Sequence, residues 1–165
     1  MSEQQTIPDN PGVITWPPLI AIATLLLGLA ADWLIPLHIF GGFLAWPIRA
    51  AIGLLLFVGG GVLALAAERT FKRVGTNVAP WEPSLRLATI GVYGYLRNPM
   101  YVGLGLMTAG AGIAFASGWT FVLMIPAALI LHNGIVRREE RYLERKFGDA
   151  YRAYKARVPR YGWPR

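Results

Sequence analysis

Long apolar stretches separated by short polar ones organise this chain. The first runs from 17 to 37 and the second from 43 to 67. Each is long enough to cross a membrane as an α-helix, which takes about 20 residues. Two shorter apolar stretches follow at 100–116 and 119–135, near the lower limit for a span. The pattern predicts an all-α, polytopic membrane protein with four transmembrane helices.

The last two apolar stretches are separated only by Ser117 and Gly118. So short a connection makes two helices run antiparallel as a hairpin, and its two open ends are expected to be neighbours. We expect Pro126 to kink the second arm. Small side chains in the first arm allow a neighbouring helix to approach closely. They are Gly103, Gly105, Ala109, Gly110, Ala111, Gly112 and Ala114.

Three polar segments complete what we interpret as a single domain, residues 1–165. Residues 1–16 form a short tail without the basic residues of a secretory signal. Residues 68–99 form a basic loop with aromatic side chains, which by length and composition could be a linker or a functional loop. The last membrane helix is expected to continue into a charged helical segment, 136–165, with a break at Gly148.

Composition and charge agree with a membrane location. The chain is 55% hydrophobic, and its mean hydropathy is +0.43. A net charge of +7 could indicate nucleic-acid binding, but every Lys and Arg except Arg49 lies between Arg69 and Arg97 or from Arg137 onward. Both basic stretches border apolar segments, which favours the positive-inside rule and anionic lipid over nucleic acid. We therefore expect both termini on the cytoplasmic side, in an inner (cytoplasmic) membrane.

Several kinds of active site are excluded by residue content. The chain has no cysteine, so it has no disulfide, thiol nucleophile or cysteine metal site. Its two histidines, His38 and His132, belong to no paired-histidine motif, and neither a phosphate loop nor a nucleophile elbow is present. We therefore expect no metal.

Two polar clusters flank the predicted hairpin and are neighbours if it forms. One is the glycine-rich junction 91–105, and the other is the pair Glu139 and Glu140. Arg97 could bind a carboxylate and the glutamates an amine or hydroxyl, or Arg97 could reach lipid head groups while the glutamates offset nearby arginines. His132, seven residues before Glu139 on the same helix face, could accept a proton or satisfy a carbonyl.

Four motifs occur in order over roughly 69–159. They are Gly91-Val92-Tyr93, Arg97 through Gly103, Glu139 through Leu143, and Phe147 through Pro159, preceded by Gly75-Thr76, Pro80 and Pro83. Each motif is weak alone. The ordered set resembles the isoprenylcysteine carboxyl methyltransferase and phospholipid methyltransferase superfamily of integral membrane methyltransferases.

The resemblance implies an enzyme that uses S-adenosyl-L-methionine, bound at the cytoplasmic end of the last hairpin, to methylate a lipophilic or membrane-embedded acceptor. Arg97 falls where this superfamily places an arginine near the reacting groups. If the acceptor is an amine, His132 or Glu140 is a candidate to take its proton. The cofactor contacts implied by motif position are Leu85, Arg86, Leu87, Ala88, Tyr93, Asn98, Pro99, Met100, Tyr101 and Glu139.

Two departures from the pattern leave the acceptor open. Prenylcysteine enzymes usually carry histidine at the position of Asn98 and arginine at that of Ile135. A prenylcysteine-like carboxylate, a phospholipid amine, a fatty acid and a small lipophilic metabolite all stay possible. Two other classes are alternatives: an NADPH-dependent membrane reductase of the sterol-reductase type, and a non-enzymatic membrane subunit.

Overall fold

A computed structural model describes residues 9–37, 39 and 44–162. This part of the chain contains helices and connecting segments without a β-strand, which confirms the all-α prediction. The elements are α1 (Pro17–Leu34), α2 (Trp46–Val74), η1 (Gly91–Gly94), α3 (Pro99–Ala114), α4 (Gly118–Leu131), η2 (His132–Val136) and α5 (Arg137–Arg157). Residues 1–8 and 163–165, at the ends of the predicted tails, lie outside the described residues. So do residues 38 and 40–43, which include His38, Gly41-Gly42 and the predicted start of the second span.

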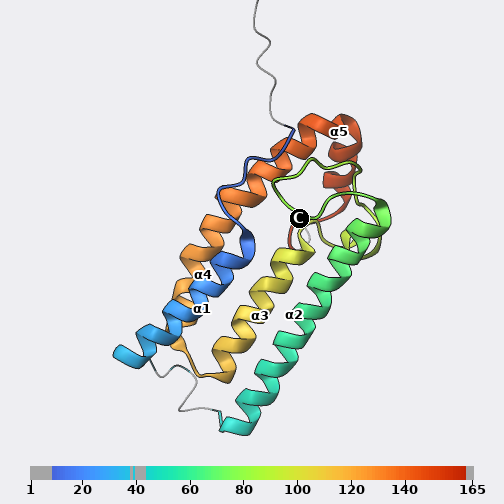
Figure 1. Cartoon of the computed structure of the whole chain (residues 1–165). Coiled ribbons are helices and arrows are strands. Elements are labelled where there is room, and N and C mark those ends of the chain that lie inside the picture. The colour runs from blue at the N-terminus through green and yellow to red at the C-terminus, as the bar shows by residue number, and fades with distance from the viewer. Residues whose placement is uncertain (1–8, 38, 40–43, 163–165) are drawn as a thin grey trace, which may run out of the picture.

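The four long apolar helices run side by side in two pairs, α2 with α3 and α1 with α4 (Figure 1). Glycines bring α2 and α3 into backbone contact. A Cβ atom on Gly103 would lie 2.6 Å from the carbonyl oxygen of Gly60, and one on Gly110 would lie 2.5 Å from that of Gly53. No side chain fits at such distances, so the predicted close approach of a neighbour to this arm is confirmed.

The predicted hairpin forms around Ser117, whose hydroxyl accepts a hydrogen bond from the Thr120 amide and caps α4. Asp32, near the end of α1, accepts hydrogen bonds from the Ser117 hydroxyl at 2.5 Å and the Trp119 amide at 3.2 Å. The two arms pack mainly on other helices, α3 on α2 and α4 on α1. The hairpin is therefore held by its turn and by its outer neighbours more than by contact between its arms.

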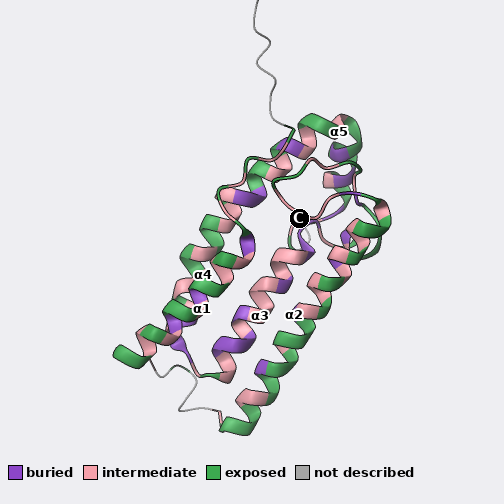
Figure 2. Ribbon diagram, viewed as in Figure 1, coloured by how far each residue is buried: buried purple, intermediate pink, exposed green. Residues whose placement is uncertain are grey.

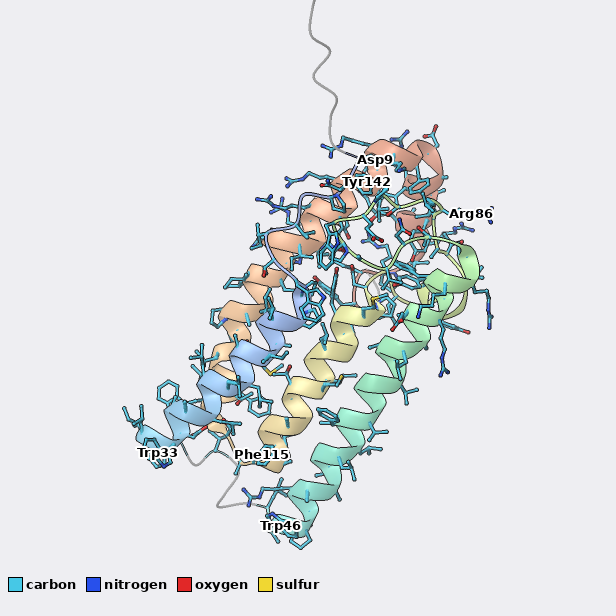
Figure 3. All side chains as sticks on the ribbon, in the orientation of Figure 1. Asp9, Trp33, Trp46, Arg86, Phe115 and Tyr142 are labelled. Carbon is cyan, nitrogen blue, oxygen red and sulfur yellow. The ribbon has the colours of Figure 1, made fainter. Side chains whose placement is uncertain are left out.

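Three described helical segments are long and apolar enough to cross a membrane: Pro17–Leu34, Trp46–Val74 and Gly118–Arg157. The shorter α3 is also apolar, at 16 residues. Figure 2 shows exposed residues along each of the long helices, and many of these residues are large and apolar. Figure 3 shows Trp33 and Trp46 at one end and Asp9 and Arg86 at the other. Exposed tryptophans at one end fit a membrane–water interface.

At the end of the bundle with Arg86, the helices continue beyond their predicted spans. Helix α2 extends past Ala67 to Val74, where Gly75 ends it in the left-handed conformation with φ of 76°. Helix α4 passes through a π-helical turn, η2, directly into α5. A bend at Gly148, with φ of 52°, confirms the predicted break and folds the rest of α5 back toward the bundle. These extensions surround the candidate site.

Candidate active site

The loop after α2, the start of α3 and helix α5 enclose a cavity of about 100 Å³. It lies at the end of the bundle opposite Trp33 and Trp46. The chain segments that line it are far apart in sequence, from Pro11 to Tyr154. Ten of the thirteen candidate residues line this cavity: Arg86, Leu87, Ala88, Tyr93, Arg97, Asn98, Met100, Tyr101, Glu139 and Glu140.

The other three candidates lie elsewhere. Leu85 is 60% exposed and does not line the cavity, although Ser84 and Arg86 do. Pro99 is fully buried as the first residue of α3. His132 borders a second cavity, deeper in the bundle. Among the described residues, no group of three or more His, Cys, Asp or Glu side chains could hold a metal ion.

Arg97 is buried in an ion-pair network. Its Nη1 atom lies 2.8 Å from Oε1 of Glu140 and donates to the Tyr151 hydroxyl at 3.3 Å. Arg160 donates to both oxygens of Glu140, at 2.7 and 2.6 Å. The Arg97 side chain is 3% exposed, so it does not reach outward to lipid. Its Nε and Nη2 atoms are buried without a hydrogen-bond partner among the described residues, which leaves two nitrogen atoms with three N–H bonds to bind an anion.

The adjacent carboxylates, Glu139 and Glu140, lie in opposite electrostatic environments. Burial favours the neutral form of Glu140, but the hydrogen bond from Arg160 and the charge of Arg97 outweigh it and lower the pKa of Glu140. Burial, together with the charge of Glu140, raises the pKa of Glu139 to about 7, despite the 2.5 Å hydrogen bond from the Tyr101 hydroxyl. The Glu140 carboxylate is thus paired with Arg97 and Arg160. The Glu139 carboxyl, in contrast, would lose its proton and become charged when a cation binds beside it.

The chain after α5 supports this site in a way that the sequence did not predict. The Arg97 amide donates to the Pro159 carbonyl at 2.9 Å, and the Asn98 side chain donates to the Arg160 carbonyl at 3.2 Å. From α5, the Tyr154 hydroxyl donates to the Tyr93 carbonyl at 2.7 Å. The helical spacing of the α5 tyrosines and the basic tail were visible in the sequence. Neither signal predicts which segment of the chain these residues contact.

The loop that closes the cavity is ordered by its own polar side chains. The Thr76 hydroxyl accepts from the Leu85 amide at 2.9 Å and the Arg86 amide at 3.3 Å. The Asn77 side chain donates to the Pro83 carbonyl at 3.1 Å. These bonds hold the backbone of 85–88 beside the cavity, so this loop forms part of the site.

Residues 9–14, which we call the N-terminal strap, cross over α5 beside the same cavity. The Asp9 carboxylate accepts from the Tyr142 hydroxyl at 2.8 Å and from Lys146 at 2.6 Å, and Arg138 donates to the Gly12 carbonyl at 2.8 Å. The Tyr142 hydroxyl in turn accepts from the Ser84 amide at 2.9 Å. Because Tyr142 contacts both segments, it ties the strap to the loop.

The second cavity, of about 430 Å³, lies between α1, α3 and α4. Tyr101 lines both cavities, so they adjoin there. His132 and Tyr161 border this cavity as well, with Nδ1 of His132 2.9 Å from the Tyr161 hydroxyl. His132 begins the π-helical turn η2, a feature that occurs often at functional sites.

Comparison with known proteins assigns most of the chain to one protein family. A family model described as phospholipid methyltransferase matches residues 48–150. Protein-S-isoprenylcysteine O-methyltransferase of Schizosaccharomyces pombe is 36% identical over 76 residues, 44% of this chain and 31% of that protein. An uncharacterized protein of Haemophilus influenzae is 36% identical over 62 residues, 38% of this chain and 98% of that protein. The chain thus matches less than a third of the yeast relative's length, and no solved structure matches.

Proposed function

The chain belongs to the phospholipid methyltransferase family, and we propose that it transfers a methyl group from S-adenosyl-L-methionine to a lipophilic acceptor. In this proposal α1 to α4 all cross the membrane, and the candidate site lies on the cytoplasmic side with both termini. Residues 1–165 then form a single membrane domain. The observation that carries the proposal is the pairing, in one cavity, of unpartnered N–H groups on buried Arg97 with the desolvated carboxyl of Glu139.

The residues present fit the charged end of the cofactor. S-adenosylmethionine carries a carboxylate, an ammonium and a sulfonium, so it needs both anion and cation partners. The free Nε and Nη2 of Arg97 suit the carboxylate, and the oxygens of Glu139 suit the cationic groups. Apolar contact for the adenosine is available from Leu87, Ala88 and Tyr93 along the same cavity.

The cavity must widen before it can hold the cofactor. Its volume of about 100 Å³ is below the range of about 300–1,000 Å³ that is usual for ligand pockets. The loop at 76–88 and Pro11 of the N-terminal strap line it without belonging to a membrane helix. These segments are the walls that we expect to move when the cofactor enters.

Within the site the chain positions charged groups. When bound, S-adenosylmethionine supplies an electrophilic methyl group on a sulfonium, and in-line transfer to an acceptor depends mainly on alignment. Glu140 and Tyr151 hold the Arg97 guanidinium in place. Since Glu140 is already paired with two arginines and its pKa is lowered, we assign it this positioning role rather than that of a proton acceptor.

A binding experiment tests this function against the alternatives. The purified protein in detergent should be stabilised against heat by micromolar S-adenosylhomocysteine and not by NADPH. Stabilisation by NADPH alone would identify a reductase, and stabilisation by neither would favour a non-enzymatic subunit.

Two variants test the placement of the cofactor. Glu139→Gln and Arg97→Lys should each weaken binding of S-adenosylhomocysteine about tenfold or more, because each removes part of a charge-assisted contact. Glu144→Gln is the matched control, since Glu144 pairs with Lys155 on α5 and does not line the cavity. Full affinity in both site variants would show that the cofactor binds elsewhere.

A further inference from the structure

The second cavity has the form of a chamber for an apolar chain. Its walls come from three helices, with Ile20 and Ala21 on α1, Val102 and Gly105 on α3, and Met124 on α4. Its volume of about 430 Å³ lies at the small end of the range for ligand pockets. A single aliphatic chain or a compact lipophilic molecule suits such a chamber better than a two-chain lipid.

The polar end of this chamber meets the proposed cofactor site. Tyr101, His132 and Tyr161 are gathered there, and Tyr101 also donates to Glu139 in the neighbouring cavity. The His132 ring is held by its Nδ1 contact with the Tyr161 hydroxyl. An acceptor lying in the chamber would therefore present its head group to an imidazole beside the methyl donor.

The charges of the residues that line the chamber indicate which acceptor head groups can bind there. Among the described residues that line the chamber, none is Lys, Arg, Asp or Glu. Arg97, with its free N–H groups, lines the other cavity. A carboxylate or phosphate in the chamber would lose its hydration without gaining a cationic partner, which costs several kcal/mol. An alkylammonium carries the same cost, because no Asp or Glu among these lining residues can pair with it. A thiol is neutral near pH 7 and can donate a hydrogen bond to histidine without this cost.

We propose that the acceptor is a single-chain lipophile ending in a thiol, bound with its chain in the chamber and its head at His132. This inference rests on the proposed function. The acceptor atom forms a bond to the methyl carbon while the carbon–sulfur bond of the sulfonium breaks and its electron pair stays on sulfur as a thioether. The proton of the thiol passes to the imidazole of His132. Tyr161 orients that ring.

Two parts of the chamber lie outside the segment shared with the family. Helix α1 and Tyr161 both fall beyond residues 48–150, whereas the residues of the proposed cofactor site lie within that segment or contact it. Acceptor preference thus depends in part on residues outside the matched segment, together with His132 and the α3 and α4 residues inside it. For that reason the names of relatives do not define its acceptor.

Acceptor class is tested with probes of matched length. The purified protein is incubated with methyl-labelled S-adenosylmethionine and decylamine, decanethiol, decanoic acid or phosphatidylethanolamine, and products are measured by mass spectrometry. Methylated decanethiol is expected, without methylated decylamine, methyl decanoate or methylated phosphatidylethanolamine. Methylation of the amine, of the acid or of the two-chain lipid overturns the inference. So does failure to methylate any probe while S-adenosylhomocysteine still binds, whereas loss of that binding would overturn the proposed function itself.

Two glycines provide a matched pair of variants for the chamber. A Cβ atom added at Gly105 or Gly59 meets nothing within 4 Å, but only Gly105 lines the chamber. Gly105→Leu should raise KM for the ten-carbon probe about tenfold, with less effect on a six-carbon probe, and leave binding of S-adenosylhomocysteine unchanged. Gly59→Leu should change none of these. Equal behaviour of the two variants would show that the acceptor does not occupy the chamber.

The head-group end is tested separately. His132→Gln should lower kcat about a hundredfold with little change in KM, as expected on losing a proton acceptor. Tyr161→Phe should lower kcat less, because it removes only the contact that orients the ring, while Tyr161→His should restore part of the loss by offering a hydrogen-bond partner again. Unchanged kcat in His132→Gln would exclude His132 from the reaction.

Discussion

The two sides of α3 show opposite uses of small residues. On the side facing α2, Gly103 and Gly110 touch backbone, and any side chain there would collide with a carbonyl oxygen. On the side facing α1 and α4, Gly105 faces open space and borders a cavity of about 430 Å³. Glycines two residues apart in one helix therefore serve close packing on one side and a chamber on the other. Composition alone does not distinguish them, because the difference lies in which helix comes close.

The largest effect is expected from disrupting the side of α3 that packs against α2. Gly103→Leu would place its Cβ atom 2.6 Å from the Gly60 carbonyl oxygen, and α2 and α3 would have to separate. We expect loss of the folded protein, measured as aggregation on size-exclusion chromatography in detergent. Gly61→Leu is the control on α2, since a Cβ atom there meets nothing within 4 Å. A monodisperse, heat-stable Gly103→Leu protein would contradict this packing.

The next largest effect is expected on stability, from the ion pair at the end of α3 that borders the candidate site. Glu140→Gln would leave Arg97 buried without its ionic partner, and removing one member of a buried pair typically costs about 3–5 kcal/mol. The melting temperature in detergent should fall by several degrees. Glu144→Gln, which breaks a more exposed pair with Lys155, should cost much less. Similar melting temperatures for the two variants would mean that the Arg97 network adds little stability.

A pH effect should follow from the carboxyl of Glu139. With its pKa at about 7, this group is mostly neutral at pH 6 and mostly ionised at pH 8. Affinity for S-adenosylhomocysteine, whose ammonium requires the ionised form, should rise about tenfold between these pH values. Glu139→Gln should abolish the rise, as measured by isothermal titration calorimetry. An unchanged pH dependence in that variant would assign it to another group.

The stability of the protein without cofactor should fall as the pH rises, in contrast to the affinity for S-adenosylhomocysteine. A carboxyl whose pKa is higher in the folded state than in the unfolded state binds its proton more tightly when folded. The stabilisation is present below the ordinary pKa of 4.5 and is lost as pH rises to about 7. Glu139→Gln should therefore be more stable than the original protein at pH 8 while binding the cofactor less well, the trade-off expected of a functional group.

The smallest effect concerns the N-terminal strap. Asp9→Asn would weaken the contacts with Lys146 and Tyr142, which lie partly in solvent. Release of S-adenosylhomocysteine should become about twofold faster, because the strap forms part of the wall that we expect to open. Asp149→Asn, which affects an exposed pair with Arg152 on the same helix, should leave the rate unchanged. Equal rates for both variants would show that the strap does not control access.

The sequence was most informative where hydrophobic pattern and turn length decide the structure. The four apolar helices and the Ser117 turn follow from those signals, and the meeting of Tyr101 with Glu139 follows from the hairpin. Contacts between distant polar segments had no comparable signal. Thr76 folding the loop and Pro159 accepting from Arg97 depend on where each segment docks after the helices have assembled. The chamber was also unpredictable, because it depends on how far apart two helices lie.

The docking of residues 159–161 has a consequence for how the protein is made. These residues are translated after α1 to α4, yet they supply the carbonyl partner of the Arg97 amide, the guanidinium that binds Glu140 and the hydroxyl beside His132. A nascent chain that has inserted all of its apolar helices still lacks these three contacts. The site is thus completed only after residues 159–161 have been made, so a chain stalled before them would occupy the membrane without an assembled site.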